Sequence, residues 1–125
     1  IYSSHGFKLQ DSFSEMVAVL DVTAAATDVG DTLDVYIDTS FDGGVTWLNI
    51  GHFTQVLGNG GAKRFLMAFK ANPVATSNVA NMTSDQTAGN ALQVGFGEHV
   101  RYRTVCVDAT TTNVSFTHSL VFHFK

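Results

Sequence analysis

Apolar and polar residues alternate with a period of two along most of the chain. In the segment TLDVYID, residues 32–38, the odd positions are apolar and the even positions hold Asp34, Tyr36 and Asp38. Side chains alternate between the two faces of a β-strand, so this pattern predicts a strand with one apolar face and one polar face. Further strand-like segments are residues 14–22, 64–69, 92–96, 100–107 and 114–124.

Short stretches rich in Gly, Asp and Asn separate these segments and predict turns. No stretch repeats apolar residues at the spacing of a helix, so we expect a helix content near zero. About seven or eight short strands joined by turns predict one antiparallel β-sandwich, of jelly-roll-like character. We expect its core to contain Leu20, Val22, Leu33, Val35, Ile37, Trp47, Phe65, Phe69, Val105, Phe116, Leu120 and Phe122.

Two segments depart from the alternation. Residues 1–10, IYSSHGFKLQ, are expected to form an N-terminal arm or the first edge strand, and residues 11–125 the sandwich. Within the sandwich, residues 71–91 carry a single charged residue and predict a long loop. Loops of that length are usually functional or disordered, and contact with a partner and solvated disorder both stay open.

The composition excludes several classes of function. The chain has 125 residues, enough for one domain, and only 14% of them are charged, against about 25% in ordinary globular proteins. Its net charge is −4 and it has no basic stripe, so we expect no electrostatic binding to nucleic acid. No apolar run approaches the ~18 residues that span a bilayer, so we expect no membrane partner. Because the sequence begins at Ile1 rather than Met, we expect that a preceding segment was removed or lies outside this sequence.

The stretch SFDGGVTW, residues 40–47, matches the Asp-box pattern S-x-D-x-G-x-T-W. It lies between two strand-like segments, so we expect it to form a hairpin whose glycines adopt positive φ and whose Asp accepts backbone hydrogen bonds. Asp-boxes recur in sialidase propellers, but a propeller needs several blades and this chain has one box. We therefore interpret the box as structural; its residues are Ser40, Asp42, Gly43, Gly44, Thr46 and Trp47.

The sequence contains no convincing catalytic, cofactor or metal motif. Asp38, Ser40, Asp42 and Gly43 match the opening of a calcium loop, but Asn49 stands where the bidentate Glu belongs. The five histidines and single cysteine lack the spacing of a zinc site, and Cys106 is expected to be a small buried apolar residue. A pair of carboxylates for glycoside hydrolysis could come from Asp34, Asp38 and Glu98, but acids on the polar face of a strand are commonly just exposed.

The order of these motifs resembles that of small virion structural proteins of tailed bacteriophages. The resemblance covers roughly residues 18–56 and 95–124. It rests on an L-D-V strand, the S-x-D-G-x-x-T-W hairpin, a G-x-F-T-Q segment, a G-x-x-x-R strand and a closing F-T strand.

This resemblance implies a capsid decoration (cement) protein or a related head-tail accessory protein. Such a protein is non-enzymatic, needs no cofactor, and lies on the outer capsid surface of the virion. Its partners would be the major capsid protein and copies of itself, most often as a homotrimer. A carbohydrate-binding or adhesin module, attached to a virion or secreted, is the alternative, with Tyr2, Tyr36 or Tyr102 as a stacking platform.

Overall fold

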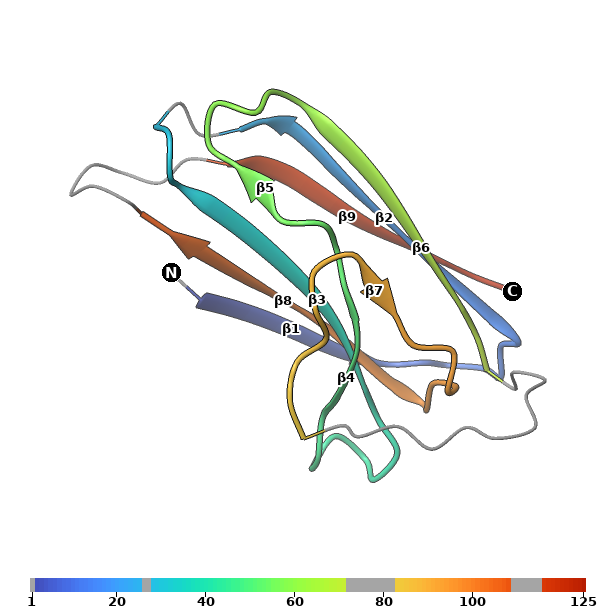
Figure 1. The fold of residues 1–125 in the computed structure, drawn as a ribbon. Coiled ribbons are helices and arrows are strands. Elements are labelled where there is room, and N and C mark those ends of the chain that lie inside the picture. The colour runs from blue at the N-terminus through green and yellow to red at the C-terminus, as the bar shows by residue number, and fades with distance from the viewer. Residues whose placement is uncertain (1, 26–27, 72–82, 109–115) are drawn as a thin grey trace.

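The protein is an antiparallel β-sandwich of two sheets (Figure 1). The computed structural model describes residues 2–25, 28–71, 83–108 and 116–125. Within these ranges there is no helix, and therefore none long and apolar enough to cross a membrane. The predicted all-β, single-domain sandwich is confirmed.

The larger sheet holds six strands and the smaller sheet holds three. In the larger sheet the strands follow the order β1 (Tyr2–Lys8), β8 (His99–Val107), β3 (Thr32–Ser40), β4 (Leu48–His52) and β7 (Asn90–Ala91), and β5 (Val56–Leu57) pairs with the start of β3. In the smaller sheet the order is β6 (Lys63–Lys70), β2 (Glu15–Ala24) and β9 (Thr117–Phe124). Residues 2–8, from the segment expected to be an arm or an edge strand, form the edge strand β1.

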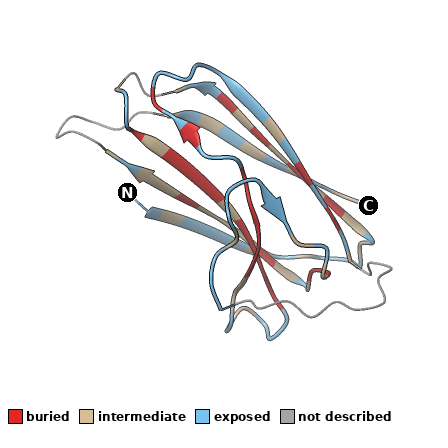
Figure 2. Ribbon diagram, viewed as in Figure 1, coloured by how far each residue is buried: buried red, intermediate tan, exposed pale blue. Residues whose placement is uncertain are grey.

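The core lies between the two sheets (Figure 2). Six of the expected core residues are buried there, on strands β2, β3 and β6: Leu20, Val22, Leu33, Val35, Ile37 and Phe69. Four more pack against the core while staying partly exposed: Phe65, Phe116, Leu120 and Phe122. The core also contains buried residues that were not on the expected list, namely Met16, Ala18, Ile50, Phe53, Val56, Met67, Phe96 and Val100.

Two expected core residues lie elsewhere. Val105 pairs with Asp34 in the register of β8 and β3, which turns its side chain to the outer face of the larger sheet. Trp47 is only half-buried, and its ring lies on the same outer face, 4.7 Å from the Arg101 guanidinium. The prediction was wrong because side-chain size and hydrophobicity do not tell which face of a sheet is the inner one.

The strand predicted at residues 92–96 is also wrong. Strand β7 ends at Ala91, although the Leu92 N–H still donates to the Ile50 carbonyl. Gly95 has a φ of 98°, a left-handed conformation that breaks the extended run. Of the long loop predicted at 71–91, residues 72–82 lie outside the described residues, and residues 83–89 run beside β4.

Gln93 protects one edge of the smaller sheet. Its side-chain amide donates to the Ala68 carbonyl at 2.7 Å and accepts from the Lys70 N–H at 3.3 Å. The amide thus occupies hydrogen-bonding positions that a further strand would use, which discourages edge-to-edge association along β6.

The packing predicts unequal costs for truncating two phenylalanines. Phe69 is 2% exposed and Phe41 is 62% exposed. We expect Phe69→Ala to lower the free energy of unfolding by about 3–5 kcal/mol, because it leaves a cavity between the sheets. Phe41→Ala is the matched control and should change stability by about 0.5 kcal/mol or less. Urea unfolding measures both, and equal costs would contradict this core.

Candidate functional site

A dense polar network covers the middle of the larger sheet's outer face. Its centre is Asp38 on β3, whose side chain is only 1% exposed. The Asp38 Oδ2 atom accepts from Nε of Arg101 and from Nε of Arg103, each at 2.7 Å. The expectation that Asp34 and Asp38 are ordinary exposed acids is wrong, since both are buried by neighbouring side chains.

Arg103 links this centre to the segment after the long loop. Its Nη2 atom donates to Asp85 Oδ1 at 2.6 Å, and its guanidinium lies 4.3 Å from the centre of the Tyr36 ring. Burial alone would lower the pKa of Arg103, but hydrogen bonds to Asp85 and Asp38 outweigh it and raise that pKa above its usual value. Arg103 is therefore a permanent charge that holds two carboxylates.

His52 forms the other half of the network. Its ring stacks on Tyr36 with 4.1 Å between ring centres. Its Nε2 atom lies 2.8 Å from Asp34 Oδ1, and its Nδ1 atom lies 2.8 Å from the Gln86 carbonyl oxygen. The Asp34 carboxylate and the Gln86 carbonyl are both hydrogen-bond acceptors, so both ring nitrogens of His52 are engaged within the protein.

Asn49 completes the network from β4. Its side-chain N–H₂ group donates to Asp38 Oδ1 at 2.9 Å and to the Ile37 and Gly51 carbonyls. Its oxygen accepts the Gln86 N–H at 2.8 Å. The network therefore joins strands β8, β3 and β4 to residues 85–86, and its contacts are those of a structural unit.

The Asp-box residues form a hydrogen-bonded hairpin between β3 and β4. Ser40 Oγ donates to Asp42 Oδ1 at 2.8 Å, and the same Asp42 oxygen accepts the Thr46 N–H at 2.8 Å. The Gly44 N–H donates to Ser40 Oγ at 2.9 Å. Gly43 and Gly44 have φ values of 76° and 88°, which favour glycine. The arrangement holds a turn and presents no reactive group.

The calcium-like spacing noted in this stretch does not produce a set of ligands. Asp38 faces two guanidinium groups on the outer face of the sheet. Ser40 and Asp42 hydrogen-bond to each other and to the turn backbone. These side chains are therefore directed to separate partners.

An open hollow of about 860 Å³ lies beside the hairpin. It is lined by the connection between β1 and β2, the first residues of the Asp-box and the turn before β8, and includes Phe41, Glu98 and His99. Asp34 and Asp38 are not among its lining residues, so the three carboxylates considered for glycoside hydrolysis do not form one site.

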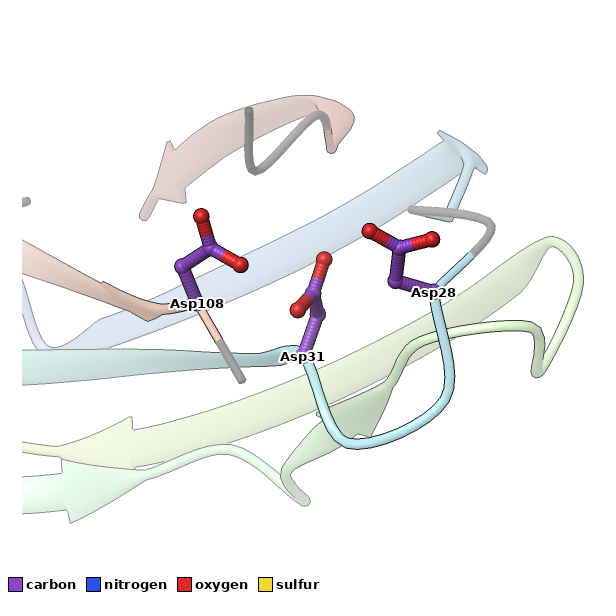
Figure 3. A group of neighbouring side chains, drawn as sticks. All are labelled: Asp28, Asp31 and Asp108. Atoms are coloured by element: carbon purple, nitrogen blue, oxygen red, sulfur yellow. The ribbon is translucent and has the colours of Figure 1, made fainter. Parts of the chain in front are cut away.

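Three carboxylates converge at the end of the larger sheet where β3 begins and β8 ends (Figure 3). One oxygen from each of Asp28, Asp31 and Asp108 lies within 4.8 Å of the others, and Asp31 is fully buried. Carboxylate oxygens are ligands of Ca²⁺ and Mg²⁺, so these residues could hold a hard cation. Acidic groups also gather without an ion. Asp28 and Asp31 are far from Asp108 in the sequence, and the pairing of Thr32 with Val107 brings them together.

The three tyrosines considered as a stacking platform are dispersed. Tyr2 is 58% exposed at the edge of the larger sheet. Tyr36 is stacked under His52 and Arg103, and Tyr102 lies on the inner side, with 6.3 Å between its ring centre and that of Phe122. Cys106 is half-buried against the core, and burial raises the pKa of its thiol.

No protein-family model, curated protein or solved structure matches the chain.

The buried charge centre predicts a contrast between two aspartates. Asp38→Asn removes the charge that Arg101 and Arg103 share, and we expect a loss of about 3–5 kcal/mol in unfolding free energy because two largely buried guanidinium groups lose that counter-ion and Arg103 keeps only Asp85. Asp21→Asn breaks an exposed pair with Arg64, at 3.4 Å, and should cost about 1 kcal/mol or less. Guanidinium unfolding compares them, and similar costs would refute the central role of Asp38.

The Asp-box geometry predicts an acidic titration midpoint. Hydrogen bonds from the Thr46 backbone and side chain, and then from Ser40, lower the pKa of Asp42 to about 2. Because the folded-state pKa is depressed, the contribution of Asp42 to stability is present above its unfolded value near 3.8 and is lost as pH falls through about 2. A carbon NMR titration of the carboxyl should show this midpoint, which Ser40→Ala should raise. A wild-type midpoint near 3.8 would rule out the hydrogen-bonded box.

Proposed function

We propose that the protein is a non-enzymatic virion structural protein, a capsid decoration (cement) protein of a phage-like particle. The observation that carries the proposal is the apolar outer face of the smaller sheet. Together with the motif resemblance to phage virion proteins, this face supports a protein that works through contact with other proteins.

We call this surface the outer face of the smaller sheet; its apolar residues are Val17 and Val19 on β2, Leu66 and Ala68 on β6, and Val121 on β9. The opposite face of the same strands forms the core. Leu66 and Val121 lie in register on either side of Val19. Leu66 is 69% exposed and Val121 is 60% exposed. Contiguous exposed apolar residues of this kind mark contact surfaces.

The polar network on the other sheet supports the same proposal. Its acidic and basic groups neutralise one another, and the groups of His52 and Asn49 that could meet a substrate are already hydrogen-bonded. A cement protein needs no reactive group, because it stabilises a shell by burying surface against it. The low proportion of charged residues, 14%, fits a protein whose surface is largely covered by neighbours.

The partners in this proposal are the major capsid protein and copies of the chain itself. The resemblance implies that three copies gather around three-fold points on the outer surface of the shell. Among the residues that the structure describes, strand β1 pairs only with β8, so its other edge could receive a neighbouring chain.

An add-back experiment tests the proposal. Phage particles lacking this gene should lose their DNA at a lower temperature than wild-type particles, and adding the purified full chain should restore the wild-type temperature. Denatured protein is the control for non-specific effects. Mass spectrometry of purified wild-type virions should detect the chain in many copies. Its absence from virions, or equal heat resistance with and without it, would overturn the proposal.

A carbohydrate-binding module is the second candidate. The observation that favours it is Phe41, which is 62% exposed and lines the hollow beside the Asp-box hairpin. An exposed aromatic ring at a polar hollow is a surface on which sugars stack. Glycan-array binding that is lost in Phe41→Ala, by a chain absent from virions, would replace the cement proposal with this one.

A further inference from the structure

The three strands of the smaller sheet are apolar on both faces. The sequence reads MVAVL at residues 16–20 of β2, LMAF at 66–69 of β6 and LVF at 120–122 of β9. Continuous apolar runs are typical of strands whose two faces are both covered by protein. In this chain one face packs on the larger sheet, while Leu66 and Val121 on the other face are 69% and 60% exposed.

The charges that border this face are arranged in columns. On β6, Arg64 and Lys70 flank Leu66 and Ala68, so that strand presents a basic, apolar, apolar, basic order. On β2 the residues in register with them are Asp21, Val19, Val17 and Glu15, an acidic, apolar, apolar, acidic order. The two neighbouring columns are thus matched in apolar positions and opposite in charge.

From this pattern we infer that the β2–β6 part of the outer face of the smaller sheet binds the same surface of a second copy of the chain. The two copies are related by a two-fold axis that runs parallel to the strands, between β2 and β6. This axis places β6 of each copy over β2 of the other. Each β6 residue then lies over the β2 residue of the partner that it pairs with in its own chain. Arg64 then faces the partner's Asp21, Lys70 faces the partner's Glu15, and Leu66 faces the partner's Val19.

The charge pattern distinguishes this arrangement from other face-to-face pairings. An axis along β2 itself would set Glu15 on Glu15 and Asp21 on Asp21. An axis across the strands would set Lys70 on Arg64 and Glu15 on Asp21. Like charges facing one another oppose association, so both alternatives are disfavoured. Sheets pack about 10 Å apart at about 30°, and the long Arg and Lys side chains can follow that rotation.

This self-contact is independent of the virion role. It involves only residues of the described outer face, and it would hold for a binding module as well as for a cement protein. On a shell, it would join copies that belong to neighbouring three-fold clusters.

The association state tests the inference. Light scattering after size exclusion, from micromolar to near-millimolar protein, should show a concentration-dependent mass reaching twice the 13.4 kDa of the chain. Leu66→Thr should weaken the association at least about tenfold, because it removes apolar contact from the centre of the interface. Val45→Thr is the matched control, since Val45 is 83% exposed on the Asp-box hairpin and should leave the mass unchanged.

Two charge-reversed chains test whether opposite charges on the two columns hold the faces together. R64E/K70E makes both columns acidic, and E15K/D21K makes both columns basic. Each variant alone should be monomeric, and circular dichroism would verify that each keeps its β-sheet spectrum. Mixed together they should form a heterodimer, because each column then faces the opposite charge.

A wild-type chain that is monomeric at all concentrations would overturn the inference and leave this face to a different protein. The inference would also fail if the wild-type chain forms an oligomer whose mass is unchanged in Leu66→Thr, or if the two charge variants do not associate on mixing. These outcomes say nothing about presence in the virion, which the add-back experiment measures separately.

Discussion

The buried carboxylate of Asp38 is the constraint on which the larger sheet depends. A charge that is 1% exposed must be neutralised, and Arg101 and Arg103 of β8 both do so. Asn49 of β4 donates to the same group, so the register of β8, β3 and β4 is held around one side chain. A slip of one residue would turn these charges towards the core, which makes the register costly to change.

The outer faces of the two sheets differ in chemistry and exposure. The outer face of the larger sheet is closed by the network around Asp38 and by residues 85–86, where the partners of Arg103 and His52 lie. The outer face of the smaller sheet is apolar and open, with Leu66 and Val121 exposed. The chain therefore combines one sheet whose outer polar groups are hydrogen-bonded to one another with a second sheet whose outer face is apolar and exposed, and this contrast supports the proposed structural role.

Local features were predictable from the sequence and long-range pairings were not. The strand pattern and the Asp-box hairpin depend on residues close in sequence. Alternation predicted strands β2, β3, β6 and β8, and the turn residues predicted the hairpin between β3 and β4. The exception is residues 92–96, where Gly95 turns the chain. Period-two patterning told which residues share a face with Asp38 but not that Arg101 and Arg103 would cover it. The convergence of Asp28 and Asp108 likewise requires the β3–β8 register.

The central claim is that the chain works by contact between protein surfaces on a virion. Electron cryomicroscopy of virions that carry this gene tests it most directly. The account predicts density for the two-sheet domain on the outer surface of the shell, with the β2–β6 part of the smaller sheet's outer face covered by another copy and the network around Asp38 intact. A shell whose outer surface lacks this domain would contradict the account.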